Sequence, residues 1–74
     1  MVKPTKVTNS IRALRERSSM TQADLARHIG VTRQTLIAIE QGKYSPTLEL
    51  AFQISRVFGV GLDDLFQYPE AEEQ

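Results

Sequence analysis

Residues 22–41, QADLARHIGVTRQTLIAIEQ, decide the fold, because their apolar side chains recur at intervals of three and four. That spacing places the apolar side chains on one face of each of two short helices. They are Leu25, Ala26 and Ile29 in the first helix, Val31 just before the second, and Leu36 and Ile39 within it. Gly30 lies between the helices and can adopt the positive φ that often ends a helix. The pattern predicts two helices joined by a tight turn, the second capped by Thr32.

This stretch resembles the helix-turn-helix of the Xre/Cro family of phage and bacterial repressors. The resemblance rests on TQADLA, VTRQT and IEQGK at their observed spacings, and it extends over about residues 9–67. The matching positions are Gln22, Leu25, Ala26, Gly30, Val31, Leu36, Ile39 and residues 40–43. The resemblance implies an all-α fold of five short helices, a lambda-repressor-like DNA-binding domain whose second and third helices form the helix-turn-helix.

The composition fits one small domain, with 74 residues, no cysteine and one histidine. Without cysteine there is no disulfide framework and no thiolate metal site, and we expect no metal, no cofactor and no catalytic residue. An enzyme is the weakest alternative, because the sequence shows no nucleophile–base set and no ligand cluster. No apolar run approaches the ~20 residues of a membrane helix, and the first ten residues lack a signal-peptide core. We therefore expect a cytoplasmic protein without a membrane partner.

The charges are unevenly distributed, although their sum is zero. Residues 1–45 hold eight Lys and Arg against three Asp and Glu, a net charge of +5. Residues 46–74 hold one basic residue against six acidic residues, a net charge of −5. This polarity suits a protein with one face on phosphate and the other turned away from it. Chance asymmetry in a short chain is the alternative interpretation.

The chain divides into three predicted segments. They are a flexible basic arm over residues 1–8, the helix-turn-helix domain over residues 9–67 and an acidic, disordered tail over residues 68–74. The first helix should begin near Asn9 or Ser10 and run to about Arg17, with Ile11 and Leu14 facing the core. Thr21 and Asp24 should then cap the second helix reciprocally.

The fourth helix should begin at the cap Thr47 and end near Phe58. Its predicted core stripe consists of Leu48, Ala51, Phe52, Ser55 and Phe58, with Ile54 at the edge. Leu50 and Val57 lie a heptad apart on a different face, which suggests a partner surface. The resemblance implies a dimer contact at the short fifth helix, over residues 62–66, and the adjoining surface. We therefore expect the dimer interface to contain Leu50, Val57 and Gly61.

The helix from Thr32 to about Gln41 is the predicted recognition helix. If Leu36, Ile39 and Glu40 face inward, its opposite face is free to enter a major groove. Arginine can bond two acceptors on guanine, and glutamine can pair with the adenine edge. The expected base contacts are Arg33, Gln34, Thr35, Ile37 and Ala38. For Ile37, partial burial against a partner helix is the alternative.

Polar groups around this helix predict phosphate contacts, because backbone phosphates attract free amides, hydroxyls and ammonium groups. The expected phosphate contacts are Thr21, Gln22, Thr32, Gln41, Lys43, Tyr44 and Ser45. For Gln22 the resemblance also implies a brace on the first residue of the recognition helix, and the alternative is an exposed glutamine without a partner. The resemblance further implies a structural salt bridge between Arg15 and Glu40, for which a weak surface pair is the alternative.

These patterns together favour sequence-specific binding of double-stranded DNA by a homodimeric transcriptional regulator, a repressor rather than an activator. One recognition helix contacts too little DNA for specific binding, whereas two domains about a two-fold axis would read the half-sites of a palindromic operator. The alternative function is an antitoxin or another protein-interaction module with the same fold. In that case the acidic tail would engage a basic toxin.

Overall fold

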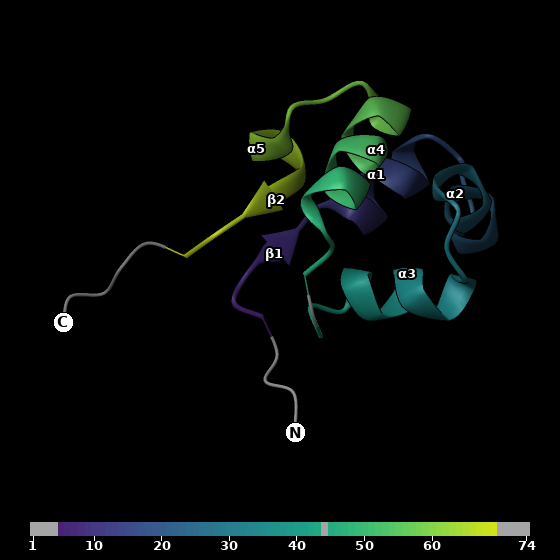
Figure 1. Cartoon of the computed structure of the whole chain (residues 1–74). Helices are drawn as coiled ribbons and strands as arrows, with labels where there is room; N and C mark the ends of the chain where they lie inside the picture. Colours follow the sequence, from purple (N-terminus) through teal and green to yellow (C-terminus); the bar gives the residue numbers. More distant parts are fainter. Residues whose placement is uncertain (1–4, 44, 70–74) are drawn as a thin grey trace, which may run out of the picture.

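The computed structural model describes residues 5–43 and 45–69. The described residues form five helices and a two-stranded antiparallel sheet. The helices are α1 (Ile11–Arg17), α2 (Gln22–Ile29), α3 (Arg33–Glu40), α4 (Leu48–Phe58) and α5 (Leu62–Leu65), and the strands are β1 (Thr8–Asn9) and β2 (Phe66–Gln67). In Figure 1, α3 lies across the lower side of the molecule, with α4 and α5 above it. None of these helices is long and apolar enough to span a membrane.

Threonine hydroxyls begin the three longest helices, as the sequence predicts. Thr21 accepts from the Asp24 N–H at 3.0 Å, and the Asp24 carboxylate accepts from the Thr21 N–H at 3.1 Å, which completes a capping box. Thr32 and Thr47 accept from backbone N–H groups three residues ahead in the same way. Each such cap stabilises its helix by about 1 kcal/mol. The turn between α2 and α3 then follows from Gly30, whose φ is 73°.

The core lies where α1, α2, α3, α4 and α5 meet, and the helix-turn-helix supplies half of it. All five apolar residues expected to face inward from α2 and α3 are buried, which confirms the pattern: Leu25, Ala26, Ile29, Leu36 and Ile39. The remaining apolar core residues are Ile11, Leu14, Ala51, Ile54 and Leu65. A fully buried Leu or Ile contributes about 1.5–3 kcal/mol, so this cluster fixes α3 against α2.

The predicted core face of α4 is right for Ala51, Ser55 and Phe58, which are buried or pack against the core, but wrong for two of its members. Leu48 and Phe52 are 68% and 49% exposed, whereas Ile54, expected at the edge of the stripe, is fully buried. Leu50 and Val57, expected on a separate partner surface, are half-buried and pack against the core. This helix carries two overlapping apolar stripes, and its spacing alone cannot say which one meets the neighbouring helices. Leu50 and Val57 are therefore not on a separate free face, and their place in a dimer interface stays a prediction.

The two short strands were not expected. Thr8 pairs with Gln67 and Asn9 with Phe66, so the end of the expected flexible arm is held in a ribbon. Phe66 was expected in the fifth helix, but α5 is a single turn and Phe66 is extended, with φ −122° and ψ 142°. Strands of two residues are too short to show an alternating pattern. Residues 1–4 of the arm and residues 70–74 of the tail lie outside the described residues.

Candidate nucleic-acid interface

The outer face of α3 is open. Arg33 and Gln34, at the start of the helix, are exposed, and the other expected base contacts, Thr35, Ile37 and Ala38, are half-buried. None of the five belongs to the core, because Leu36 and Ile39 fill the inward positions of this helix. The half-burial of Ile37 and Ala38 explains how apolar side chains lie on an outward face without a partner in the structure.

A depression of about 990 Å³ lies beside this face, bounded by α1, the turn after it, the start of α2 and α3. Arg33 and Ile37 line it together with three of the expected phosphate contacts, Thr21, Gln22 and Gln41. Arg12 and Glu16 of α1 complete the opposite wall. Residues that are far apart in the sequence thus form one concave surface next to the predicted recognition helix.

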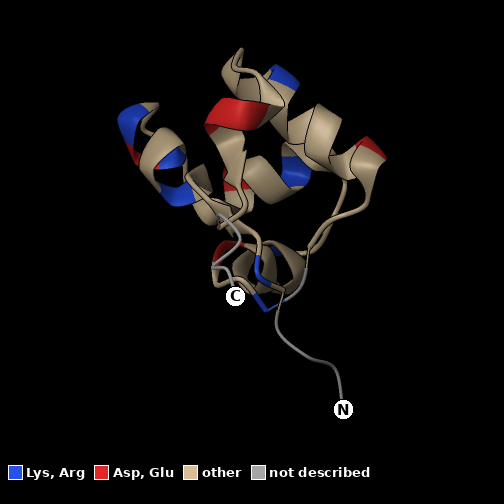
Figure 2. Cartoon of the chain, turned by 90° about the vertical axis from the view of Figure 1, so that its left-hand side faces the viewer, with Lys and Arg blue, Asp and Glu red and all other residues tan. Residues whose placement is uncertain are grey.

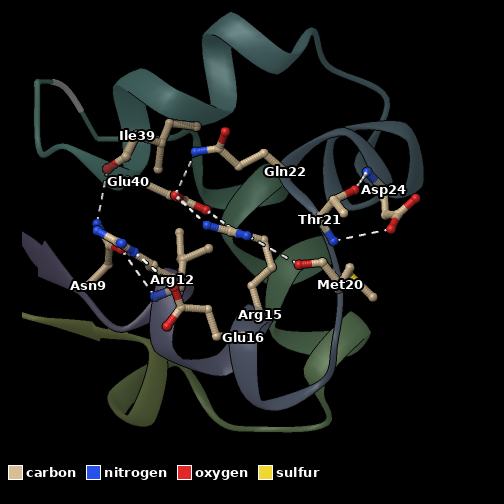
Figure 3. Close-up of polar contacts among 11 residues, drawn as sticks. Asn9, Arg12, Arg15, Glu16, Met20, Thr21, Gln22, Asp24, Ile39 and Glu40 are labelled. Carbon is tan, nitrogen blue, oxygen red and sulfur yellow. Dashed lines mark hydrogen bonds and ion pairs between the residues drawn. The ribbon is translucent and has the colours of Figure 1, made fainter.

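A buried ion pair holds the end of α3 against α1, as expected. Arg15 Nε and Nη2 donate to the Glu40 carboxylate at 2.8 and 3.2 Å, and the two side chains are only 11% and 6% exposed. Arg15 Nη1 also donates to the Met20 carbonyl at 3.2 Å, which ties the turn after α1 to the same guanidinium (Figure 3). A two-pronged contact of this kind fixes orientation as well as distance.

Gln22 braces a different residue from the one expected. Its Nε2 donates to Glu40 Oε1 at 3.2 Å, so it contacts the last residue of α3 and not the first, Arg33. A carboxylate is a stronger acceptor than a neutral group, which explains why the half-buried amide turns toward Glu40. The alternative of an exposed glutamine without a partner is wrong as well. The end of α3 is thus tied to α1 through Arg15 and to α2 through Gln22.

Asn9 is a further contact that the sequence did not reveal. Its Nδ2 donates to the Ile39 carbonyl at 3.0 Å, and its Oδ1 accepts from the Ile11 N–H at 3.1 Å (Figure 3). The sequence suggested Asn9 or Ser10 as the cap of the first helix; Ser10 is the N-cap residue but makes no side-chain cap bond, and Asn9 bonds to the first N–H of the helix. A bond between residues thirty positions apart has no signature in the local sequence.

The loop after α3 offers side chains more than backbone amides. Gly42, at φ 75°, ends the helix, and its N–H donates to the Ile39 carbonyl at 3.0 Å. The Lys43 N–H donates to the Ala38 carbonyl at 3.0 Å, which completes a Schellman cap. Gly42 thus ends the helix as expected, whereas the Lys43 amide is engaged, contrary to the expectation of free amides in this loop. Lys43 and Ser45 are exposed, and Tyr44 lies outside the described residues.

Acidic groups accompany the basic groups near this surface. Arg12 Nε lies 3.1 Å from Glu16, and Arg27 Nη2 lies 2.8 Å from Asp24. Hydrogen bonds with the backbone and side chain of Thr21, followed by the charge of Arg27, lower the pKa of Asp24. In Figure 2, several basic segments lie together on the left of the molecule, but an acidic segment lies among them and others are scattered over the remaining helices. Arg12 and Arg27 are thus paired with carboxylates and are not part of a uniform basic face.

The profile of a helix-turn-helix family matches residues 11–65, most of the described chain. The chain belongs to this helix-turn-helix family, HTH_3. The protein is 50% identical over 64 residues to the HTH-type transcriptional regulator MJ0272 of Methanocaldococcus jannaschii, across 86% of this chain and 97% of that protein. It is 34% identical over 58 residues to the cryptic phage CTXphi transcriptional repressor RstR of Vibrio cholerae, across 78% of this chain and 52% of the repressor.

A solved structure of a putative DNA-binding protein from Bacteroides fragilis has the same fold, with a TM-score of 0.74 at 20% identity over 82% of this chain and 98% of that one. The resemblance to the Xre/Cro repressors and the predicted fold are confirmed. Within this family, α2 and α3 correspond to the helix-turn-helix. The domain that contains them is a DNA-binding domain of the type found in transcriptional regulators.

Proposed function

We propose that the protein is a homodimeric transcriptional repressor that places α3 in the major groove of a palindromic operator. The observation that supports this most directly is the open face of α3 beside the depression lined by Arg12, Gln22 and Arg33. A helix of this family with polar side chains outward and apolar side chains in the core can enter a groove without unfolding. The family and its named regulators support the same function.

In this proposal the first turn of α3 reads the bases. Arg33 donates two hydrogen bonds to guanine, and Gln34 pairs with the adenine edge. Ile37 and Ala38, farther along the helix, contact thymine methyl groups, and Thr35 bonds to a base from the flank. Recognition helices contact base edges chiefly with their N-terminal residues. The two most exposed polar side chains of α3 are at that end.

Phosphate contacts from both sides of α3 hold it in register. Gln41, Lys43, Tyr44 and Ser45 contact the backbone after the helix, and Thr21, Gln22 and Thr32 contact it before the helix. The contact from Lys43 is made by its ammonium, since its backbone N–H caps α3. These contacts supply most of the affinity, and the base contacts supply the discrimination.

The dimer interface in this proposal lies on α4, at a different place from the one the sequence suggested. A mostly apolar groove of about 390 Å³ is lined by Val7, Ser45, Pro46, Leu48, Ala51, Leu62, Asp63 and Phe66. Leu48 forms part of its rim at 68% exposure, Phe52 follows one turn later at 49%, and Gly61 is exposed at the start of α5. A groove next to a protruding apolar side chain suits a two-fold contact, in which each copy fills the groove of the other.

A selection of bound duplexes from random DNA, followed by sedimentation of the complex, tests this function. We expect a palindrome with half-sites about one helical turn apart and two protein chains per duplex. Recovery of no preferred sequence would refute sequence-specific recognition. A preferred sequence without two-fold symmetry, bound by one chain, would refute the homodimer alone.

A further inference from the structure

The two ends of α3 are held very differently. Three side chains from three segments meet the last two residues of the helix: Asn9 of β1 at Ile39, and Arg15 of α1 and Gln22 of α2 at Glu40 (Figure 3). At the first residues, by contrast, the polar contacts in the described part of the chain are those of Thr32 with Thr35. Core packing of Leu36 and Ile39 holds α3 along its length, and hydrogen bonds from other segments orient it in addition at the end opposite the bases.

The bond from Asn9 differs from the other two because it acts on the backbone of α3. Arg15 and Gln22 share one carboxylate, and in Figure 3 Asn9 lies on the opposite side of Glu40 from Gln22. Its amide orientation is fixed by its partners. If the oxygen and nitrogen were exchanged, an oxygen would face the Ile39 carbonyl and an NH2 group would face the Ile11 N–H. Asn9 thus joins the start of α1 to the last turn of α3.

The two-stranded sheet of β1 and β2 holds the backbone of Asn9 in place. Asn9 pairs with Phe66 in the two-stranded sheet, and the next residue, Ser10, donates its N–H to the Leu65 carbonyl at 2.9 Å. Leu65 is fully buried in the core. The side chain of Asn9 therefore extends to α3 from a backbone held on both sides.

A small tilt of α3 about its anchored end would move the base-reading end substantially. Arg33 lies six residues before Ile39, or about 9 Å along a helix that rises 1.5 Å per residue. A tilt of about 10° would displace Arg33 by about 1.5 Å. Functional groups must be held within about 0.5 Å to keep a productive geometry. Loss of one anchor would therefore weaken base reading before it weakened contact with phosphates, whose geometry is less demanding.

We propose that Asn9 is a positioning residue for DNA recognition, acting through its bond to the Ile39 carbonyl. This inference rests on the proposed sequence-specific binding of DNA. Asn9 does not touch the bases; it fixes the direction in which α3 leaves its anchored end. Its removal lowers the ratio of operator affinity to random-DNA affinity and leaves the affinity for random DNA nearly unchanged.

Asn9→Asp separates the two bonds of this side chain. The carboxylate still accepts from the Ile11 N–H and is favoured at the positive end of α1, but its second oxygen faces the Ile39 carbonyl. Thr8→Asp is the matched control, because it adds the same charge one residue away at an exposed position of the same strand. The probes are the duplex that the wild type selects from random DNA and a scrambled duplex of equal length.

We expect Asn9→Asp to lower the selected-to-scrambled affinity ratio about tenfold, the scale of one lost base contact, while Thr8→Asp leaves the ratio unchanged. Combined with Arg33→Ala, it should lower the ratio less than it does alone, since one of the base-reading groups that the tilt displaces is already absent. An unchanged ratio in Asn9→Asp, or an equal fall in Thr8→Asp, would overturn the positioning role. The ratio is measured well below the melting temperatures of all variants, so that partial unfolding does not enter it.

Asn9→Ser keeps the experiment decisive if Asn9→Asp fails to fold. Serine can still accept from the Ile11 N–H but cannot reach Ile39, and it adds no charge. The same fall in the ratio is expected, and its absence overturns the inference. A wild type that prefers no duplex at all refutes the proposed function. A wild type with a clear preference that both Asn9 variants retain refutes only the role of Asn9.

Discussion

The faces around α3 and α4 are built in opposite ways. On α3 the exposed side chains are the polar Arg33 and Gln34, and a buried ion pair between Arg15 and Glu40 lies beneath this face. On α4 the outward side chains include Leu48 and Phe52, above a core without such a pair in the described residues. The difference teaches that one small domain can expose polar side chains above a buried ion pair on one helix and apolar side chains on another, which is the arrangement that the two proposed partners require. Each prediction below alters one face and leaves the other intact.

The largest effect is expected beneath the α3 face. Glu40→Gln leaves the Arg15 guanidinium buried without a negative partner, which should lower the free energy of unfolding by about 3–5 kcal/mol. For a domain of this size, that corresponds to a fall in melting temperature of at least about 12 °C. Thermal unfolding measures it. Glu49→Gln, at an exposed position of α4, is the control for the lost charge and should change little. Equal melting temperatures would show that the pair carries no stability.

The α4 face should respond next, through self-association. Leu48→Asp removes an apolar side chain that is mostly exposed in a single copy, and a two-fold contact loses it twice. We expect a loss of about 2–4 kcal/mol in dimerisation, with the fold retained because Asp suits the first turn of a helix. Sedimentation against Gln53→Asp, an exposed residue of α4 outside the groove lining, measures the change. An unchanged dimer would place the interface elsewhere.

Sequence could identify the helix-turn-helix in full but only part of the buried face of α4, since Leu48 and Phe52 were placed in the core and are exposed. In α2 and α3 the caps, Gly30 and the apolar spacing all indicate one arrangement, and the structure has it. In α4 the apolar residues at Leu48, Leu50, Phe52 and Val57 fit two faces equally well. Contacts with helices distant in the sequence decide between the two. A single sequence therefore fixes an element whose signals are local and leaves open one whose orientation is decided by packing.

The same distinction explains which parts of the candidate interface were foreseen. The outward positions of α3 follow from helical periodicity within one segment, and the Arg15–Glu40 pair followed from the resemblance. The partner of Gln22 and the bond from Asn9 to Ile39 join separate segments and have no local signature. The N–H groups of Gly42 and Lys43 bond to carbonyls of α3 in the helix cap. The glycine in the sequence indicates that the helix ends there, but it does not show which N–H groups the cap uses.

Two single changes on the α3 face should separate base reading from phosphate contact. Arg33→Ala should cost about 1–3 kcal/mol with the selected duplex and little with a scrambled one, because only the base contact depends on sequence. Lys43→Ala should weaken both duplexes alike and reduce the slope of log affinity against log salt by about one. Titrations at several salt concentrations measure both. If Arg33→Ala kept the wild-type affinity ratio, Arg33 would not read sequence.

The smallest effect tests whether the depression beside α3 receives a DNA strand. Glu16 lines it, and its carboxylate holds Arg12 at 3.1 Å with both side chains largely exposed. Because such a surface pair is worth under ~1 kcal/mol, Glu16→Gln should leave stability nearly unchanged. The substitution should release Arg12 and remove a charge that repels phosphate. DNA affinity should therefore rise a few-fold at low salt, and this gain should shrink as salt is added. Glu49→Gln makes the same charge change on α4, and equal gains in the two variants would mean that net charge alone, and no strand in the depression, accounts for the effect.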